Sequence, residues 1–220
     1  MTLGDDMTDQ PDKPAANELP SVRFFETQFQ RQIQESDFGL NPFETVAFDY
    51  VFGDVLDLGC GLGNLSLEVA KRGCKVTAVD GSPSAVSRIQ RATEEGSLPI
   101  EAVLADLATY VIPHDFDTVV AIGLLMFFRR DRALAILDEI KSRVRTGGRA
   151  VVNVLVEGTT SMDMFDPGNY CLLDREELLH HFADWNVLVW RPETYSAPRG
   201  TVKEFSTLIA EKPRPIPKAR

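Results

Sequence analysis

Short apolar runs alternate with amphipathic segments through the middle of the chain. Five of the runs are rich in β-branched and aliphatic residues and are short, which is typical of buried strands. They cover residues 55–58, 75–80, 100–105, 116–122 and 150–156. The segments 63–72, 83–95 and 131–145 between them place apolar residues at helical spacing. Strands separated by helices of this length need crossover connections, so the pattern predicts an α/β fold with a parallel sheet.

The last part of the chain has a different pattern. Gly147 and Gly148 are expected to end the helix of residues 131–145, and Asp174 to cap a helix that ends at His181. Residues 185–191 and 201–210 then follow as two strands joined by a loop around Arg199. Because the connection is short, we expect these two strands to form an antiparallel hairpin at the edge of the sheet.

The loop after the first predicted strand contains Gly59, Gly61 and Gly63 at alternating positions. Glycine permits positive φ and a close approach of backbone to ligand, and nucleotide-like cofactors bind at the carboxyl end of such a strand. The dinucleotide pattern Gly-x-Gly-x-x-Gly would need a third glycine where this chain has Asn64. The pattern present is Asp-x-Gly-x-Gly-x-Gly, beginning at Asp57. A nicotinamide dinucleotide is thereby disfavoured, and a purely structural turn is the other alternative.

This motif resembles motif I of the class I S-adenosylmethionine-dependent methyltransferases, in which the loop holds the methionine half of the cofactor. The predicted hairpin is a second likeness, since that family ends its parallel sheet with an antiparallel pair of strands. The resemblance covers most of residues 50–211. It implies a Rossmann-like three-layer sandwich with a mostly parallel seven-stranded sheet and a C-terminal antiparallel hairpin. It also implies S-adenosyl-L-methionine as the cofactor.

The resemblance assigns roles to residues at the strand ends. Asp80 would accept hydrogen bonds from both ribose hydroxyls, although capping of the next helix is its alternative role. Asp106 and the N–H of Leu107 would contact the adenine, and Asp57 would orient the loop or bind the cofactor's ammonium group. The expected cofactor-binding residues are Asp57, Gly59, Cys60, Gly61, Gly63, Asp80, Gly81, Ser82, Asp106, Leu107, Ile122 and Gly123.

The chemistry of a sulfonium methyl donor sets what else the protein must supply. The leaving group is already activated, so the enzyme mainly aligns a nucleophile and excludes water. A thiolate or selenide needs no strong base, whereas a hydroxyl or an amine does. The three histidines, His114, His180 and His181, show no triad or metal-ligand spacing. The sequence therefore favours a base-free mechanism, with no catalytic residue and no metal site assigned.

The segment that follows the fourth predicted strand resembles one branch of the family. Leu125-Met126-Phe127 matches a Leu-Met-Phe run of the tellurite-resistance methyltransferases. That branch has a His-Arg pair between its last two strands, where this chain keeps Arg199 and lacks the His, so tellurite itself is not implied. Core packing is the alternative role of Met126 and Phe127, and solvation that of Arg199. The substrate candidates are Phe25, Met126, Phe127, Tyr170 and Arg199.

Two segments are expected to cover the substrate. Residues 21–50 precede the first strand and are rich in phenylalanine, so helices here would cover the carboxyl edge of the sheet, although most of these aromatic residues would also pack against it. The loop of residues 157–172 contains the adaptable side chains of Met162 and Met164 and suits a small, partly apolar molecule.

Composition and charge bound the remaining possibilities. A net charge of −10 argues against a nucleic-acid partner. The sequence has no apolar run long enough for a membrane span, no signal-peptide pattern, and three cysteines without disulfide or zinc spacing.

We therefore expect a cytoplasmic monomer or homodimer that methylates a small molecule and contacts neither membrane nor nucleic acid. Methylation of a protein and cofactor binding without catalysis are the alternatives. Residues 1–20 are predicted to be a disordered acidic arm, 21–211 the methyltransferase domain and 212–220 a basic, Pro-rich tail.

Overall fold

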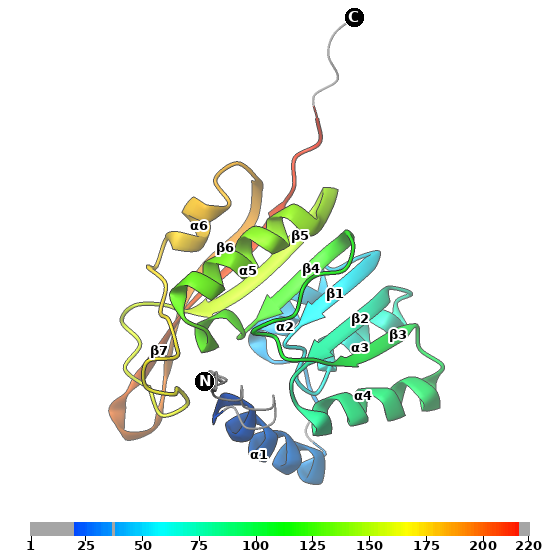
Figure 1. Ribbon diagram of the computed structural model, residues 1–220, viewed down its shortest axis with the longest axis horizontal. Helices are drawn as coiled ribbons and strands as arrows, with labels where there is room; N and C mark the ends of the chain where they lie inside the picture. Colours follow the sequence, from blue (N-terminus) through cyan, green and yellow to red (C-terminus); the bar gives the residue numbers. More distant parts are fainter. Residues whose placement is uncertain (1–19, 37, 216–220) are drawn as a thin grey trace, which may run out of the picture.

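The computed structural model describes residues 20–36 and 38–215. Its centre is a seven-stranded sheet with helices on both faces (Figure 1). The strands are β1 (Asp54–Leu58), β2 (Lys75–Asp80), β3 (Ile100–Leu104), β4 (Phe116–Ile122), β5 (Val144–Leu155), β6 (Asn186–Ser196) and β7 (Val202–Glu211). Their order is β3-β2-β1-β4-β5-β7-β6. The first five are parallel, and β7 runs antiparallel to both β5 and β6. The predicted fold class, including the C-terminal hairpin, is confirmed.

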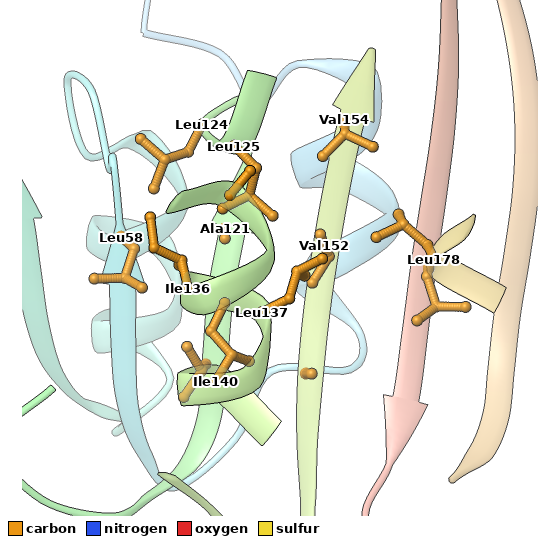
Figure 2. Packing of buried hydrophobic residues seen from close by; sticks show 14 of the residues in the cluster. Leu58, Ala121, Leu124, Leu125, Ile136, Leu137, Ile140, Val152, Val154 and Leu178 are labelled. Carbon is orange, nitrogen blue, oxygen red and sulfur yellow. The ribbon is translucent and has the colours of Figure 1, made fainter. Parts of the chain in front are cut away.

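Helices form the two outer layers of the sandwich. One face is covered by α2 (Pro42–Phe48), α3 (Asn64–Lys71) and α4 (Pro83–Gly96), and the other by α5 (Arg130–Arg143) and α6 (Glu177–His181). Figure 2 shows Leu137 and Ile140 of α5 packed over Ala121 of β4 and Val152 of β5, all of them fully buried. Burying each Leu or Ile side chain contributes about 1.5–3 kcal/mol. This packing fixes the strands whose carboxyl ends carry the loops described below.

Capping residues set where the helices beside those loops begin. Asn41 caps α2 by accepting hydrogen bonds from the N–H groups of Phe43 and Glu44, and the Glu44 carboxylate accepts one from Asn41 N. This reciprocal pair is a capping box. Ser82 caps α4, since its Oγ accepts from Ala85 N at 3.1 Å. Both helices have proline in their first turn, where its missing N–H costs nothing.

The prediction that Gly147 and Gly148 end a helix of residues 131–145 is wrong. The chain leaves α5 at Arg143, and Val144 is already extended, buried and paired with Phe116 of β4. The two glycines lie inside β5, at a register shift between β4 and β5. A Cβ on Gly148 would lie 2.6 Å from the carbonyl oxygen of Asp117. Glycine here therefore permits a close approach of backbone within a strand rather than a helix end.

The hairpin and the helix before it also differ from prediction. β6 continues to Ser196 instead of ending at residue 191, and Pro192 lies within it. This is tolerated because β6 is the edge strand, where a missing N–H need not break the sheet. Asp174 accepts a hydrogen bond from Glu176 N but forms only a turn, and α6 begins later, at Glu177.

The first residue of the predicted basic tail is held by the domain. Lys212 Nζ donates to the carbonyl oxygens of Lys141 and Val144, both at 2.8 Å, where α5 ends. A cation at a helix C-terminus is favoured by the helix dipole. Residues 216–220, like the predicted acidic arm up to residue 19, lie outside the described residues. None of the helices in the described ranges combines the length and the apolar character that a membrane span requires.

Candidate active site

A cavity of about 470 Å³ lies at the carboxyl ends of the parallel strands. The glycine loop after β1 and the helix α1 (Pro20–Glu35) both contribute residues to its lining, and α1 lies beside α4 (Figure 1). Eleven of the twelve predicted cofactor-binding residues line it: Asp57, Gly59, Cys60, Gly61, Asp80, Gly81, Ser82, Asp106, Leu107, Ile122 and Gly123. The structure therefore brings together residues that the sequence places at the ends of four different strands.

The glycine loop lies in close contact with neighbouring segments of the chain. Gly59 has a φ of 68°, and its N–H donates to the carbonyl of Val79 on β2 at 2.8 Å. A Cβ at this position would lie 2.9 Å from Leu124 Cδ1, closer than carbon atoms pack. Any side chain at Gly59 would therefore displace Leu124 or the loop.

Gly63 is the one predicted cofactor residue that does not line the cavity. It precedes α3 with a φ of 72°, and a Cβ there would lie 2.6 Å from Ile89 Cγ1 of α4. Gly63 therefore permits α3 and α4 to pack closely, and its contact with the cofactor stays a prediction.

Asp80 anchors the loop and keeps capacity for a ligand. Its Oδ2 accepts from Gly61 N and its Oδ1 from Ser82 N, both at 2.8 Å. Burial raises the pKa of this carboxyl above its ordinary value, although the backbone hydrogen bonds oppose the shift. Each carboxylate oxygen has a second acceptor position, so a vicinal diol could still bind. Ser82 caps α4, so helix capping, the alternative role considered for Asp80, is performed by another residue.

Asp57 is a buried carboxyl with no cationic partner among the described residues. Burial raises its pKa from 3.8 to about 7, a hydrogen bond from Ser66 Oγ at 2.6 Å opposes the shift, and the nearby Glu44 and Asp80 add to it. An ammonium group placed against Asp57 would reverse the shift. The site therefore fits a positively charged group at this point.

Asp106 makes a local turn beside the cavity. Its Oδ1 accepts from Ala108 N at 2.9 Å, as in an Asx turn. Asp106 and Leu107 nevertheless line the cavity. Its role as a turn residue and its exposure to a ligand are therefore compatible.

A contact that the sequence did not reveal joins α1 to α4. The Glu26 carboxylate accepts hydrogen bonds from the hydroxyls of Ser82 and Ser84. Burial raises the pKa of Glu26, but these hydrogen bonds, with one from Gln30, outweigh burial and hold it below its ordinary value. Glu26 thus fastens the helix that covers the cavity to the N-terminus of α4.

Aromatic side chains from three segments form one side of the cavity. Phe25 of α1 meets Phe127 of the short helix η2 (Leu125–Phe127) edge to face, with 5.1 Å between ring centroids. Phe127 in turn packs on Phe165 at 5.3 Å. Phe25, Met126 and Phe127, three of the five substrate candidates, line the cavity. Tyr170 does not line it, because its ring stacks on the outer side of the series, 5.0 Å from Phe165.

A further part of the lining comes from α2, within the segment 21–50 that was expected to cover the substrate, and from β7 of the hairpin, which the sequence analysis did not assign to the site. Phe43 packs against Phe205 with centroids 4.6 Å apart, and Lys203 also lines the cavity. Asn153 of β5 is fully buried and donates from Nδ2 to Thr207 Oγ1 at 2.9 Å, but its Oδ1 has no partner among the described residues. In the sequence, the alternation of side chains between the two faces of the hairpin strands was the pattern that could have indicated these residues.

Arg199 and the three histidines lie away from the cavity. Arg199 forms the exposed tip of the hairpin in η3 (Pro198–Gly200), where it pairs with Asp163, so its prediction as a substrate contact is not supported by its position. His114 stacks on Phe116 near the opposite edge of the sheet, and His180 and His181 belong to α6.

Cys60 lines the cavity but is a poor nucleophile. Burial raises the pKa of its thiol well above the ordinary value, and the carboxylates of Asp80 and Asp57 add to the shift. It therefore stays protonated at neutral pH and acts as a small packing side chain.

Comparisons with known proteins agree with this geometry. Residues 55–148 match the family model described as a methyltransferase domain. The chain is 28% identical over 164 residues to hemagglutinin 1 of Eikenella corrodens, covering 72% of this chain and 54% of that protein. It is 27% identical over 165 residues to the "Probable S-adenosyl-L-methionine-dependent methyltransferase TehB" of Haemophilus influenzae, covering 72% and 57%. The chain thus spans little more than half the length of these curated relatives.

A solved structure shows the same fold. The crystal structure of TehB from Haemophilus influenzae has a TM-score of 0.70 at 22% identity, over 86% of this chain and 67% of that one. Residues 55–148, which match the family model, contain the glycine loop and Asp80. The strand order includes the C-terminal hairpin that we expected. Residues 55–148 therefore match a methyltransferase domain, and the chain has the fold of the solved TehB structure.

Proposed function

We propose that the protein transfers the methyl group of S-adenosyl-L-methionine to a small-molecule acceptor with a soft nucleophile, such as a thiol or a chalcogen oxyanion. The observation that carries the proposal is that two sets of side chains line one cavity. The first set is the carboxylates of Asp57, Asp80 and Asp106, and the second is phenylalanine and methionine side chains. The first set suits a cofactor with a diol and an ammonium group, and the second suits an apolar acceptor.

The residues expected to bind the cofactor have distinct roles in this proposal. Asp80 accepts hydrogen bonds from the ribose hydroxyls, and Asp106 with Leu107 N contacts the adenine. Asp57 faces the ammonium group, which is consistent with its buried carboxyl and raised pKa. Ile122 and Gly123 lie against the methionine portion.

The chain's own contribution to the reaction is alignment and exclusion of water. When bound, the cofactor supplies a methyl group on an activated sulfonium leaving group. Phe25 and Phe127 hold the acceptor from one side, and α1, fastened by Glu26, closes the cavity toward solvent. None of the cavity-lining residues within the described ranges is a histidine, and the Cys60 thiol is protonated. An acceptor that already carries an ionised nucleophile meets these conditions without a general base.

The proposal is tested by turnover with a panel of acceptors. Purified protein is incubated with S-adenosyl-L-methionine and thiols, selenite, tellurite or phenols, and S-adenosylhomocysteine is quantified. We expect turnover with thiols or chalcogen oxyanions and little with phenols. Tight cofactor binding without turnover on any acceptor would favour a non-catalytic binding protein, and turnover only with protein substrates would favour a protein methyltransferase. A cytoplasmic location and a monomeric or homodimeric state remain predictions.

A further inference from the structure

Charge is distributed unevenly around the cavity. Its carboxylates, Asp57, Asp80, Asp106 and Glu44, come from α2 and from strand ends of the parallel sheet. Lys203 of β7 is the one basic side chain among the lining residues in the described part of the chain. Among these charged side chains, only Lys203 would attract an anionic group.

Strand alternation determines which way Lys203 faces. Thr207 pairs with Asn153 and Phe205 with Leu155, so Lys203, two residues before Phe205, shares their face of the sheet. Leu155 is the last residue of β5. Lys203 therefore lies beyond the end of the neighbouring strand, where β7 borders the opening of the cavity instead of the core.

Apolar and aromatic groups surround this position. Phe205 packs on Phe43 at 4.6 Å, and Tyr195, which pairs with Lys203 across the hairpin, lies 5.6 Å from Phe43. A ligand bound here would meet ring surfaces with an ammonium group at one end. Such an arrangement suits a molecule with an apolar body and a single anionic group.

The other charged groups of the hairpin already have partners. Arg199 pairs with Asp163, Arg191 with Glu193 at 3.0 Å, and Glu204 lies 3.7 Å from Arg175 on the opposite face. No carboxylate forms an ion pair with Lys203 among residues 20–36 and 38–215. Lys203 is therefore the hairpin cation that is available to an anionic ligand.

We propose that Lys203 binds a carboxylate of the methyl acceptor, so that the acceptor is a small organic acid whose apolar body carries the nucleophile. This inference rests on the proposed function, since it names the acceptor class of the same site. Lys203 acts as a specificity-determining residue: it holds the acceptor by its acid group and leaves the nucleophile free to face the cofactor.

The test compares two thiols of similar shape, 4-mercaptobenzoate and the neutral 4-methylbenzenethiol. In the Lys203→Met variant, we expect the KM for 4-mercaptobenzoate to rise about 10- to 100-fold, the loss of one charge-assisted hydrogen bond. The kcat, the KM for the neutral thiol and the affinity for S-adenosyl-L-methionine should stay within about twofold. Lys203→Arg should restore most of the preference. Arg199→Met, which removes an exposed hairpin cation outside the cavity, is the matched control and should change none of these values.

A binding experiment keeps the inference separate from turnover. Calorimetry of 4-mercaptobenzoate with the protein loaded with S-adenosylhomocysteine should show binding that Lys203→Met weakens and Arg199→Met does not. If no thiol is methylated but this pattern holds, the proposed soft-nucleophile chemistry fails while the anion site stands. Equal binding of both thiols by the wild type, or equal effects of Lys203→Met on both, would overturn the role of Lys203.

Discussion

The two ends of strand β1 carry the same residue type in opposite circumstances. Asp54, at the amino end, lies 3.2 Å from an Arg145 nitrogen and 3.8 Å from His114 Nε2. Asp57, three residues along the strand, is buried with a hydroxyl and two further acids, Glu44 and Asp80, nearby. The first aspartate is balanced by the protein itself, whereas the second is not.

The pKa values of the neighbouring acids follow the same division. At the amino end, burial raises the pKa of Asp117, but a hydrogen bond from Asp54 N and the contact with Arg145 outweigh burial and lower it. At the carboxyl end, burial raises the pKa of both Asp57 and Asp80. Carboxylates that stabilise the fold are paired with cations, and carboxylates left without one mark a place for a ligand.

The largest expected effect is that of Asp80→Ala on cofactor binding. Removing an acceptor of two charge-assisted hydrogen bonds should weaken S-adenosyl-L-methionine binding by roughly 100-fold, measured by calorimetry. Asp54→Ala, at the other end of the sheet, should leave this affinity unchanged. Thermal unfolding of each variant without cofactor checks that Asp80→Ala is folded. Unchanged affinity in folded Asp80→Ala would show that Asp80 does not bind the cofactor. It would also contradict the proposed difference between the carboxyl and amino ends of the strands.

A smaller effect is expected from pH, through Asp57. Burial raises its pKa to about 7, so the free protein holds a proton there at pH 6 that must leave when an ammonium group binds. Cofactor affinity should rise about tenfold between pH 6 and pH 8, since one unit below the pKa roughly a tenth of the groups are ionised. Asp57→Asn should bind more weakly and lose this difference, which separates it from titration of the cofactor's own amine. An identical pH profile in Asp57→Asn would contradict the assignment.

The same shift has a consequence for stability. In the unfolded chain Asp57 is protonated mainly below pH 3.8, so the folded state binds more protons between pH 4 and pH 7. The contribution of Asp57 to the stability of the cofactor-free protein is therefore present below pH 4 and lost as pH rises through about 7. Denaturant unfolding at pH 5.5 and pH 8 measures the free energy of unfolding at each pH. The decrease from pH 5.5 to pH 8 should be smaller in Asp57→Asn than in the wild type.

The smallest effect is expected at the amino edge. Asp117→Asn should reduce the free energy of unfolding by about 0.5–1 kcal/mol, because the pair with Arg145 is partly exposed. In the wild type this contribution is present above the unfolded pKa and is lost as pH falls through the lowered pKa of Asp117. Cofactor affinity should stay within twofold of the wild type. A large loss of affinity would show that the two edges are coupled.

Much of the cofactor side of the site follows from the sequence because it is local. Gly59 and Gly61 follow Asp57 by a few residues, and Asp80 ends a short buried strand whose end is evident from its residues. Parallel strands end at one edge, so residues that follow different strands meet there without any knowledge of packing. The sequence did not reveal the packing role of Gly63, because a glycine required by the packing of α3 on α4 looks the same in sequence as one required by a ligand.

The acceptor side was decided by tertiary structure. Lys203 reaches the cavity because β7 pairs antiparallel with β5 in one register, and a shift of β7 by one residue would turn this side chain to the other face. The same register carries Arg199 out to the hairpin tip and leaves it to Asp163. Thus the sequence by itself determined the fold class and the cofactor loop, through periodicity and backbone chemistry. Which cation faces the acceptor depended on strand pairing between distant segments, which periodicity alone does not specify.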